Sequence, residues 1–119
     1  MADIAIIDDS QATLDMLATI LRRDNHQVRT YQSSLAVEKS LAVTRPNLIL
    51  LDVVMPERNG YEVLRSLQRN EATKDIPVIL VSSKAEETDI RWGKRQGAAA
   101  YVTKPFTSEH LLETVNSYL

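Results

Sequence analysis

The sequence predicts an α/β fold in which a strand and a helix alternate five times and the strands form one parallel sheet. Short apolar runs of strand length alternate with longer segments whose apolar residues recur at helical spacing. Four of the apolar runs also end in polar residues. Because parallel strands bring their carboxyl ends to one edge of a sheet, we expect these polar endings to meet there, where open α/β proteins place their chemistry.

The first unit is a strand at residues 3–7 followed by a helix over about 10–24. The strand is apolar, and the helix shows leucines at three- and four-residue spacing. Asp9 and Ser10 are both suitable N-caps, since a short polar side chain there accepts a free amide of the first turn.

The second unit begins at residues 27–31, where apolar and polar residues alternate, as in an edge strand with one exposed face. We expect the next helix to open at Ser33 or Ser34 and to end before Pro46, which disfavours helix in the residue that precedes it. Its expected apolar residues are Leu35, Leu41 and Val43.

The last three units follow the same rule. Strands are expected at 47–51, 78–81 and 99–102, and helices at 60–69, at 86–96 and from Thr107 or Ser108 with Leu111, Leu112 and Val115 inward. The run at 47–51 is apolar almost throughout, which predicts a central strand buried on both faces. Gly97 supplies the backbone freedom that ends the helix before it.

Size and composition restrict the possible functions. The chain has 119 residues, 44% hydrophobic and 25% charged, and we expect one domain over residues 1–119 with no output domain. A formal net charge of -2 with interspersed signs argues against nucleic-acid binding. Cysteine, a membrane-length apolar stretch and a secretory leader are all absent, so we expect a cytoplasmic protein that does not bind membranes. His26 and His110 lie away from the strand ends and are expected on the surface.

Parallel strands would bring together Asp8, Asp9, Asp52, Ser82 and Lys104. Two carboxylates ~4 Å apart repel by roughly 4 kcal/mol at an effective dielectric constant near 20, so a positive charge must offset them. Lys104 is one candidate and a divalent cation is the other. Mg²⁺ fits better than Ca²⁺ or Zn²⁺, because few carboxylates are available and no Cys or His ends a strand.

Such a site is equipped to accept a phosphoryl group. An ionised Asp52 can act as the nucleophile and needs no general base. The cation and Lys104 would neutralise the phosphoryl oxygens, and Ser82 would donate a hydrogen bond to them. Ser82 is preferred to Ser83 for its distance from Asp52 along the chain.

These residues, in this order, resemble the response-regulator receiver domain of the CheY type, and the resemblance covers the whole chain. It implies a doubly wound, flavodoxin-like (βα)5 fold with strand order 2-1-3-4-5. Asp8 and Asp9 match the metal-binding acidic pair of that family, Asp52 its phospho-acceptor, and the backbone carbonyl of Val54 its third protein ligand to Mg²⁺.

The remaining motifs concern the switch. Ser82 matches the hydroxyl residue of the family and Tyr101 its switch aromatic, while Lys104 and Pro105 match its lysine and the usually cis proline that follows. The resemblance implies a phosphorylation-dependent switch of a two-component phosphorelay. A histidine kinase would donate the phosphoryl group, and the changed face, made by the fourth helix, fifth strand and fifth helix, would bind a downstream protein.

By this resemblance the chain is a regulator, monomeric or weakly dimeric, that catalyses only its own phosphoryl transfer and dephosphorylation. Residues 87–98 are further similar to receivers of the PilH type, from pilus-linked, chemotaxis-like pathways that control twitching motility. The apolar side chain of Val54 offers nothing to orient an attacking water, which predicts slow to moderate loss of the phosphoryl group. Trp92 either packs against its neighbours or meets a partner.

Other functions remain open. A phosphatase of the haloacid dehalogenase type also forms an aspartyl phosphate at a strand end, but that family has a second Asp where this chain has Val54. A pseudo-receiver that acts as a scaffold without phosphorylation is a further alternative, against which the full set of site residues argues. A flavin- or nucleotide-binding protein is disfavoured, because none of the three glycines forms a phosphate-cradling loop after a strand.

Overall fold

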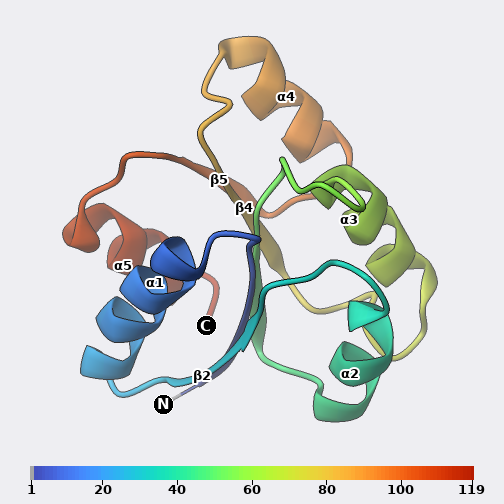
Figure 1. The fold of residues 1–119 in the computed structure, drawn as a ribbon, viewed down its shortest axis with the longest axis horizontal. Helices are drawn as coiled ribbons and strands as arrows, with labels where there is room; N and C mark the ends of the chain where they lie inside the picture. Colours follow the sequence, from blue (N-terminus) through green and yellow to red (C-terminus); the bar gives the residue numbers. More distant parts are fainter. Residues whose placement is uncertain (1) are drawn as a thin grey trace.

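The computed structural model describes residues 2–119 and shows a five-stranded parallel sheet in the order β2-β1-β3-β4-β5, as predicted (Figure 1). The strands are β1 (Asp3–Ile7), β2 (Gln27–Tyr31), β3 (Leu48–Leu51), β4 (Val78–Ser82) and β5 (Ala100–Thr103). The helices are α1 (Gln11–Arg23), α2 (Val37–Thr44), α3 (Gly60–Arg69), α4 (Glu87–Arg95) and α5 (Ser108–Asn116). Helices α1 and α5 cover one face of the sheet, and α2, α3 and α4 lie on the other.

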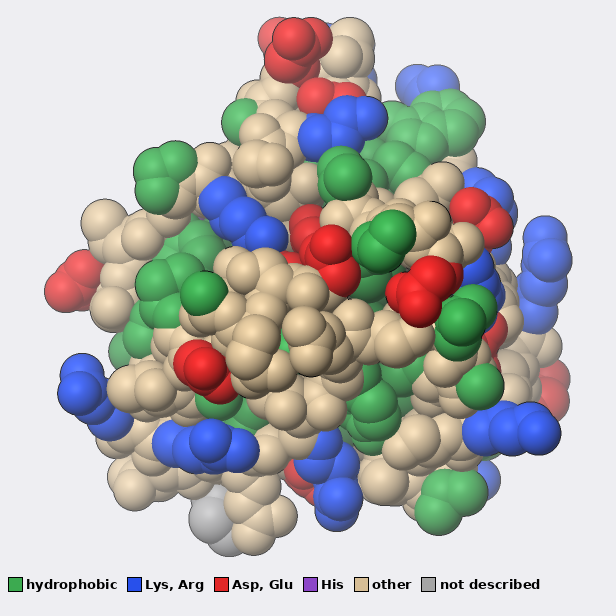
Figure 2. All heavy atoms as spheres, in the orientation of Figure 1, with side chains coloured by type: hydrophobic (Ala, Val, Ile, Leu, Met, Phe, Trp, Pro, Cys, Tyr) green, Lys and Arg blue, Asp and Glu red, His purple; other side chains and the backbone are tan. Residues whose placement is uncertain are grey.

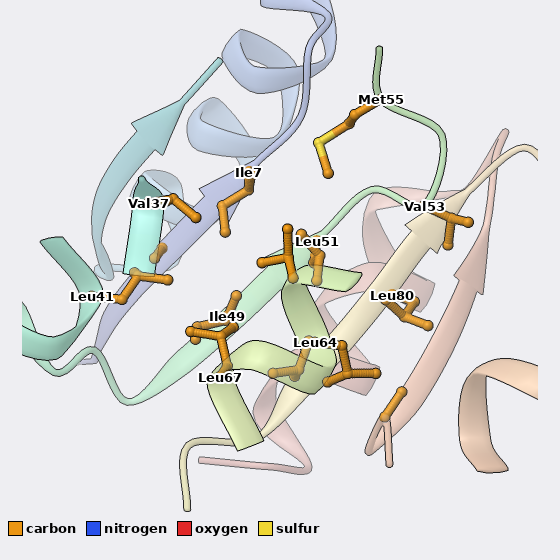
Figure 3. Close-up of a cluster of buried hydrophobic side chains, with 14 residues drawn as sticks. Ile7, Val37, Leu41, Ile49, Leu51, Val53, Met55, Leu64, Leu67 and Leu80 are labelled. Carbon is orange, nitrogen blue, oxygen red and sulfur yellow. The ribbon is translucent and has the colours of Figure 1, made fainter. Parts of the chain in front are cut away.

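Alternate residues of the central strands enter two separate cores. In β3, Ile49 and Leu51 pack with residues of α2 and α3, whereas Leu48 and Leu50 pack with α1 and α5. Figure 3 shows the first core, in which Leu64 of α3 lies against the sheet. All four residues of β3 are buried, as predicted for a central strand, while β2 at the edge is largely exposed. Both faces of the sheet are therefore covered, and the chemistry is left to its ends.

Three helices begin at side-chain caps, of which those at Ser10 and Thr107 were among the predicted positions. The Ser10 hydroxyl, rather than the Asp9 carboxylate, caps α1 by accepting an amide hydrogen bond from Thr13. Asn59 and Glu62 form a reciprocal capping box at the start of α3, and Thr107 caps α5. Each such cap satisfies an amide that the helix itself leaves free, which is worth roughly 0.5–2 kcal/mol.

The predicted start of the second helix is wrong: α2 begins at Val37, not at Ser33 or Ser34. The Ser33 hydroxyl accepts the amide of Leu35 at 3.1 Å, and such local bonds favour a turn over a helix. Leu35, expected within the helix, therefore lies in the turn before it and is 57% exposed. Val43 lies within α2, as expected, and is 83% exposed.

Other boundaries differ by one residue. Strand β3 begins after Asn47, whose side chain accepts the amide of Asp3 at 2.8 Å and ties the loop to β1. Strand β4 extends to Ser82, and β5 is shifted one residue along the chain from the predicted range. Glu86, predicted within the fourth helix, instead forms a capping box with Asp89 at its start.

His26 is not a surface side chain, contrary to expectation, since only 7% of it is exposed. Its ring lies 3.3 Å from the Asp24 carboxylate and 3.2 Å from the Asn116 amide oxygen. These contacts join the turn after α1 to the end of α5, at the edge of the sheet opposite the predicted site. Within residues 2–119, no helix is both long enough and apolar enough to span a membrane.

Candidate functional site

Four strands, β1, β3, β4 and β5, bring the polar residues to one edge of the sheet. Ile7 of β1 lies opposite Leu51 of β3, so the residues that follow them, Asp8 and Asp52, leave the sheet side by side. Ser82 is the last residue of β4, and its carbonyl accepts the amide of Lys104 at 2.8 Å. Residues separated by nearly the whole chain are therefore neighbours because the strands are parallel.

Three carboxylates meet at this edge. Asp8, Asp9 and Asp52 each have a carboxylate oxygen within 4.8 Å of the others. Asp8 and Asp52 are 2% and 7% exposed, whereas Asp9 is open to solvent. The Ser10 amide donates to Asp8 Oδ1 at 2.9 Å and fixes the direction of that side chain. The site is thus an acidic cluster in which two of the three carboxylates are buried; Figure 2 shows acidic atoms beside a basic side chain near the middle of the visible face.

Lys104 supplies the positive charge of the pocket. Its Nζ lies 2.9 Å from Asp8 Oδ2 and 3.7 Å from Asp52 Oδ1. One ammonium against three carboxylates leaves two negative charges uncompensated when all are ionised. Closely spaced oxygen donors with excess negative charge fit a hard divalent cation such as Mg²⁺, with water completing its coordination.

The environment of Asp52 raises its pKa to about 6. Burial is the main cause, because it disfavours the charged form, and the neighbouring charge of Asp8 acts in the same direction. Lys104 and the backbone amides of Val53 and Val54 oppose the rise by stabilising the carboxylate. Asp52 is therefore a carboxylate that a bound cation would stabilise strongly.

Helix α3 starts directly against the backbone of Asp52. The Gly60 amide donates to the Val53 carbonyl at 2.7 Å, and a Cβ at position 60 would lie 2.2 Å from the Asp52 carbonyl oxygen. Any side chain there would push the helix away from the site. This role of Gly60 was not predicted, although its position directly after the Asn59 cap was a usable signal.

Ser82 and Tyr101 form the next part of the site. Ser82 is fully buried and its hydroxyl accepts the amide of Lys84 at 3.2 Å, whereas Ser83 is exposed. The Tyr101 hydroxyl donates to the carbonyl of Lys84, so both side chains bind the same loop. Burial raises the pKa of Tyr101 to about 12, against the effect of the nearby Ser82 hydroxyl. The phenol therefore stays protonated and remains a donor at physiological pH.

A glycine in α4 makes room for the Tyr101 ring. A Cβ at Gly93 would lie 2.8 Å from Leu80 Cδ1 and 3.0 Å from Tyr101 Cδ2. Gly93 is the buried residue of α4, so the helix backbone packs directly on β4 and β5. This contact was not predicted from the sequence.

The remaining predicted residues lie around the pocket. The peptide bond between Lys104 and Pro105 is cis, and the side chain of Val54 is 55% exposed beside Asp52. The structure thus brings Asp8, Asp9, Asp52 and Lys104 together. The roles of these residues, of Ser82 and Tyr101, of Pro105 and of the Val54 carbonyl stay predictions.

An ion pair behind the pocket was also missed. Arg58, in the loop between β3 and α3, contacts both carboxylate oxygens of Glu38 on α2, at 2.9 and 2.8 Å. It also donates to the Ser34 carbonyl, and the Ser66 hydroxyl of α3 donates to Glu38 at 2.8 Å. The pair lowers the pKa of Glu38 and anchors the loop that follows Asp52. Residues 20 positions apart gave no sequence pattern from which it could be predicted.

Comparison with known proteins agrees with the geometry. Residues 4–116 match the family described as the response regulator receiver domain. The chain is 41% identical to protein PilH of Pseudomonas aeruginosa over 119 residues, which cover 100% of this chain and 98% of PilH. It is 33% identical to PilG of the same organism over 116 residues, 98% of this chain and 86% of PilG.

Solved structures give the same result. The chemotaxis protein CheY4 of Vibrio cholerae superposes with a TM-score of 0.92 at 26% identity, over 100% of this chain and 99% of CheY4. These similarities confirm the predicted CheY-like fold and the resemblance to receivers of the PilH type.

Proposed function

The chain belongs to the response regulator receiver domain family, and from this premise we propose that it switches by accepting a phosphoryl group on Asp52 from a histidine kinase. Receivers of this kind serve two-component and chemotaxis-like signalling. The observation that carries the assignment of Asp52 is the buried carboxylate at the end of β3, with Lys104 Nζ at 3.7 Å and two further carboxylates beside it.

The chemistry follows from these neighbours. An oxygen of ionised Asp52 attacks the phosphorus, the bond from phosphorus to the donor nitrogen breaks, and its electron pair leaves with the imidazole. Lys104 lies between Asp8 and Asp52, so its ammonium can turn to a phosphoryl oxygen without leaving the pocket. We expect the Ser82 hydroxyl, at the neighbouring strand end, to donate a hydrogen bond to another phosphoryl oxygen.

Mg²⁺ is the proposed cofactor. Asp8, Asp9 and Asp52 would hold it with the Val54 carbonyl, and it would neutralise charge on the phosphoryl oxygens. The fit rests on the oxygen-only donor set and on the two negative charges that Lys104 leaves uncompensated. The protein contributes to this site by holding three carboxylates within 4.8 Å of one another.

We propose that Ser82 and Tyr101 report the modification. If Ser82 turns toward the phosphoryl group, its hydroxyl leaves the Lys84 amide, and the loop that also binds the Tyr101 hydroxyl must adjust. The change would reach the face of α4, β5 and α5, where a downstream protein binds. Pro105, after Lys104, would hold the following loop in place.

The wider setting is also a proposal. Similarity to PilH suggests a chemotaxis-like pathway that controls twitching motility. We propose that it acts by binding partner proteins, as a monomer or weak dimer. We place it in the cytoplasm, where histidine kinases obtain their phosphoryl groups from ATP. The haloacid dehalogenase alternative is disfavoured by Val54, whose exposed apolar side chain cannot serve as a second acid.

Reaction with acetyl phosphate and Mg²⁺, followed by intact mass measurement, tests the proposal. We expect the mass of one phosphoryl group to be added to the native chain and none to be added to Asp52→Asn. A native chain that gains no mass would support the pseudo-receiver. Multiple turnover of phosphomonoesters would support the phosphatase, and either result would overturn the proposal.

A further inference from the structure

Trp92, the single tryptophan of the chain, has 47% of its surface exposed on α4. The Trp92 ring packs edge-to-face with the Tyr61 ring of α3. The two ring centroids are 6.5 Å apart and the ring planes meet at 82°. On α4, Ile90 is partly buried and Gly93 is buried, and every residue of the helix other than these two and Trp92 is polar. Neither the core nor the phosphoryl site accounts for so large an exposed aromatic surface.

Trp92 borders a shallow hollow of about 160 Å³ lined by Thr88, Arg91, Trp92 and Arg95, which we call the Trp92 surface. Arg91, Trp92 and Arg95 follow Thr88 by three, four and seven residues, so the four side chains share one side of the helix. No carboxylate lines the hollow. Arg95 has no ion-pair partner among residues 2–119, and Arg91 pairs only with the exposed Glu87 at 2.7 Å. Such exposed pairs are weak, so both guanidinium groups are available to a partner.

The Trp92 surface lies on a different side of α4 from the one that packs on β4 and β5. Gly93 marks the inner side of α4, against Tyr101 and Leu80. The contacts of Trp92 are made instead with Tyr61, on the α3 side of the helix. The Trp92 surface therefore looks outward and toward α3, away from β5 and α5.

We propose that the Trp92 surface binds an acidic protein segment in which carboxylates flank one apolar side chain. The planar forks of Arg91 and Arg95 match carboxylates, which they can hold through paired hydrogen bonds. The exposed Trp92 ring offers apolar area beside them. Tryptophan and arginine are also the residues that most often carry the binding energy of protein interfaces. Because none of these groups touches Asp52, the proposal stands apart from the phosphoryl chemistry.

Two other occupants fit less well. A second copy of the chain in a two-fold contact would set Arg91 and Arg95 against the same residues of its partner, and like charges repel. A nucleic acid requires a broader concentration of Lys and Arg. Here Glu86 and Glu87 stand at the start of the same helix, and the net charge of the chain is -2.

Titration with a short blocked peptide, in which glutamates flank a central leucine, tests the proposal. Emission from Trp92 reports binding at the surface itself, because the chain has no other tryptophan. We expect the emission to change and the amide resonances of Thr88, Arg91 and Arg95 to shift. Arg95→Glu should weaken binding about tenfold or more. Lys39→Glu, the same charge change at an exposed site on α2, should leave it unchanged.

Several results would overturn the proposal. These are unchanged Trp92 emission at millimolar peptide, equal loss of binding in Arg95→Glu and Lys39→Glu, or shifts confined to β5 and α5. Equal binding of a peptide with glutamine in place of glutamate would remove the requirement for carboxylates. Self-association abolished by Arg95→Glu would make a second copy the occupant.

Discussion

Asp52→Asn should stabilise the metal-free protein at neutral pH, although it removes the proposed phospho-acceptor. Burial and the charge of Asp8 raise the pKa of Asp52 from 3.8 to about 6, and its side chain is only 8% exposed. A rise of about two pH units corresponds to about 3 kcal/mol of folding free energy lost when the carboxylate is ionised. Asparagine keeps the shape without the charge. Because Lys104 loses one of its two neighbours, we expect a net gain of about 1–3 kcal/mol.

The gain should depend on pH. The folded protein holds the proton of Asp52 more tightly than the unfolded chain, since the folded pKa is about 6 and the unfolded value 3.8. The cost of the native aspartate is therefore absent at pH below 3.8, grows as the pH rises to about 6, and is complete above that. The two proteins should have similar stability in acid and diverge through this window.

Urea unfolding at a series of pH values in the presence of a chelator measures the difference. Asp75→Asn is the matched control, because Asp75 is exposed and its side chain has no hydrogen bond or ion pair among residues 2–119. The reasoning would be refuted if Asp52→Asn were no more stable than the native chain at pH 7. It would equally be refuted by a difference that did not change between pH 4 and pH 7.

Four further changes give independent tests. Asp9→Ala should weaken Mg²⁺ binding about tenfold or more in isothermal titration, and unchanged binding would contradict the metal assignment. Val54→Asn should speed loss of the phosphoryl group, measured by intact mass over time, because it adds a polar group that can orient water; an unaltered rate would count against this. Gly93→Ala should displace the switch tyrosine, seen in its ring resonances, and cost about 1–3 kcal/mol in urea unfolding, since the new Cβ would lie 3.0 Å or less from two side chains. Glu38→Gln should cost about 1 kcal/mol at neutral pH by weakening the pair with Arg58. Because the folded state lowers the pKa of Glu38, that cost should vanish as the pH falls through this pKa, and a loss that persisted in acid would contradict it.

Much of the fold could be predicted because the apolar runs that form the strands are followed directly by the polar residues that form the site. The apolar run at 48–51 is buried on both faces, and it can be so only in the middle of a covered parallel sheet. In that position β3 pairs with β1, and the register between the two strands places Asp8 next to Asp52. The approach of Lys104, 96 positions from Asp8, then follows from topology alone.

Features that depend on backbone conformation or on contacts between helices could not be predicted in this way. The start of α2 was misplaced because Ser33 can cap either a helix or a turn, and the left-handed Ala36, with φ of 58°, has no sequence signature. Gly93 was passed over because a glycine within a helix indicates close approach only when its neighbour across the gap is known. The Arg58 and Glu38 pair joins a loop to a helix at no regular spacing.

The central proposal for this protein is that Asp52 accepts the phosphoryl group beside Lys104. A crystal structure of the chain with Mg²⁺ and beryllofluoride tests this directly. We expect the beryllofluoride group on the Asp52 carboxylate, within hydrogen-bond distance of Lys104 Nζ and the Ser82 hydroxyl. We expect Asp8 and Asp9 to hold the metal. Density for the group at another carboxylate, or none at Asp52 at saturating concentration, would contradict the account.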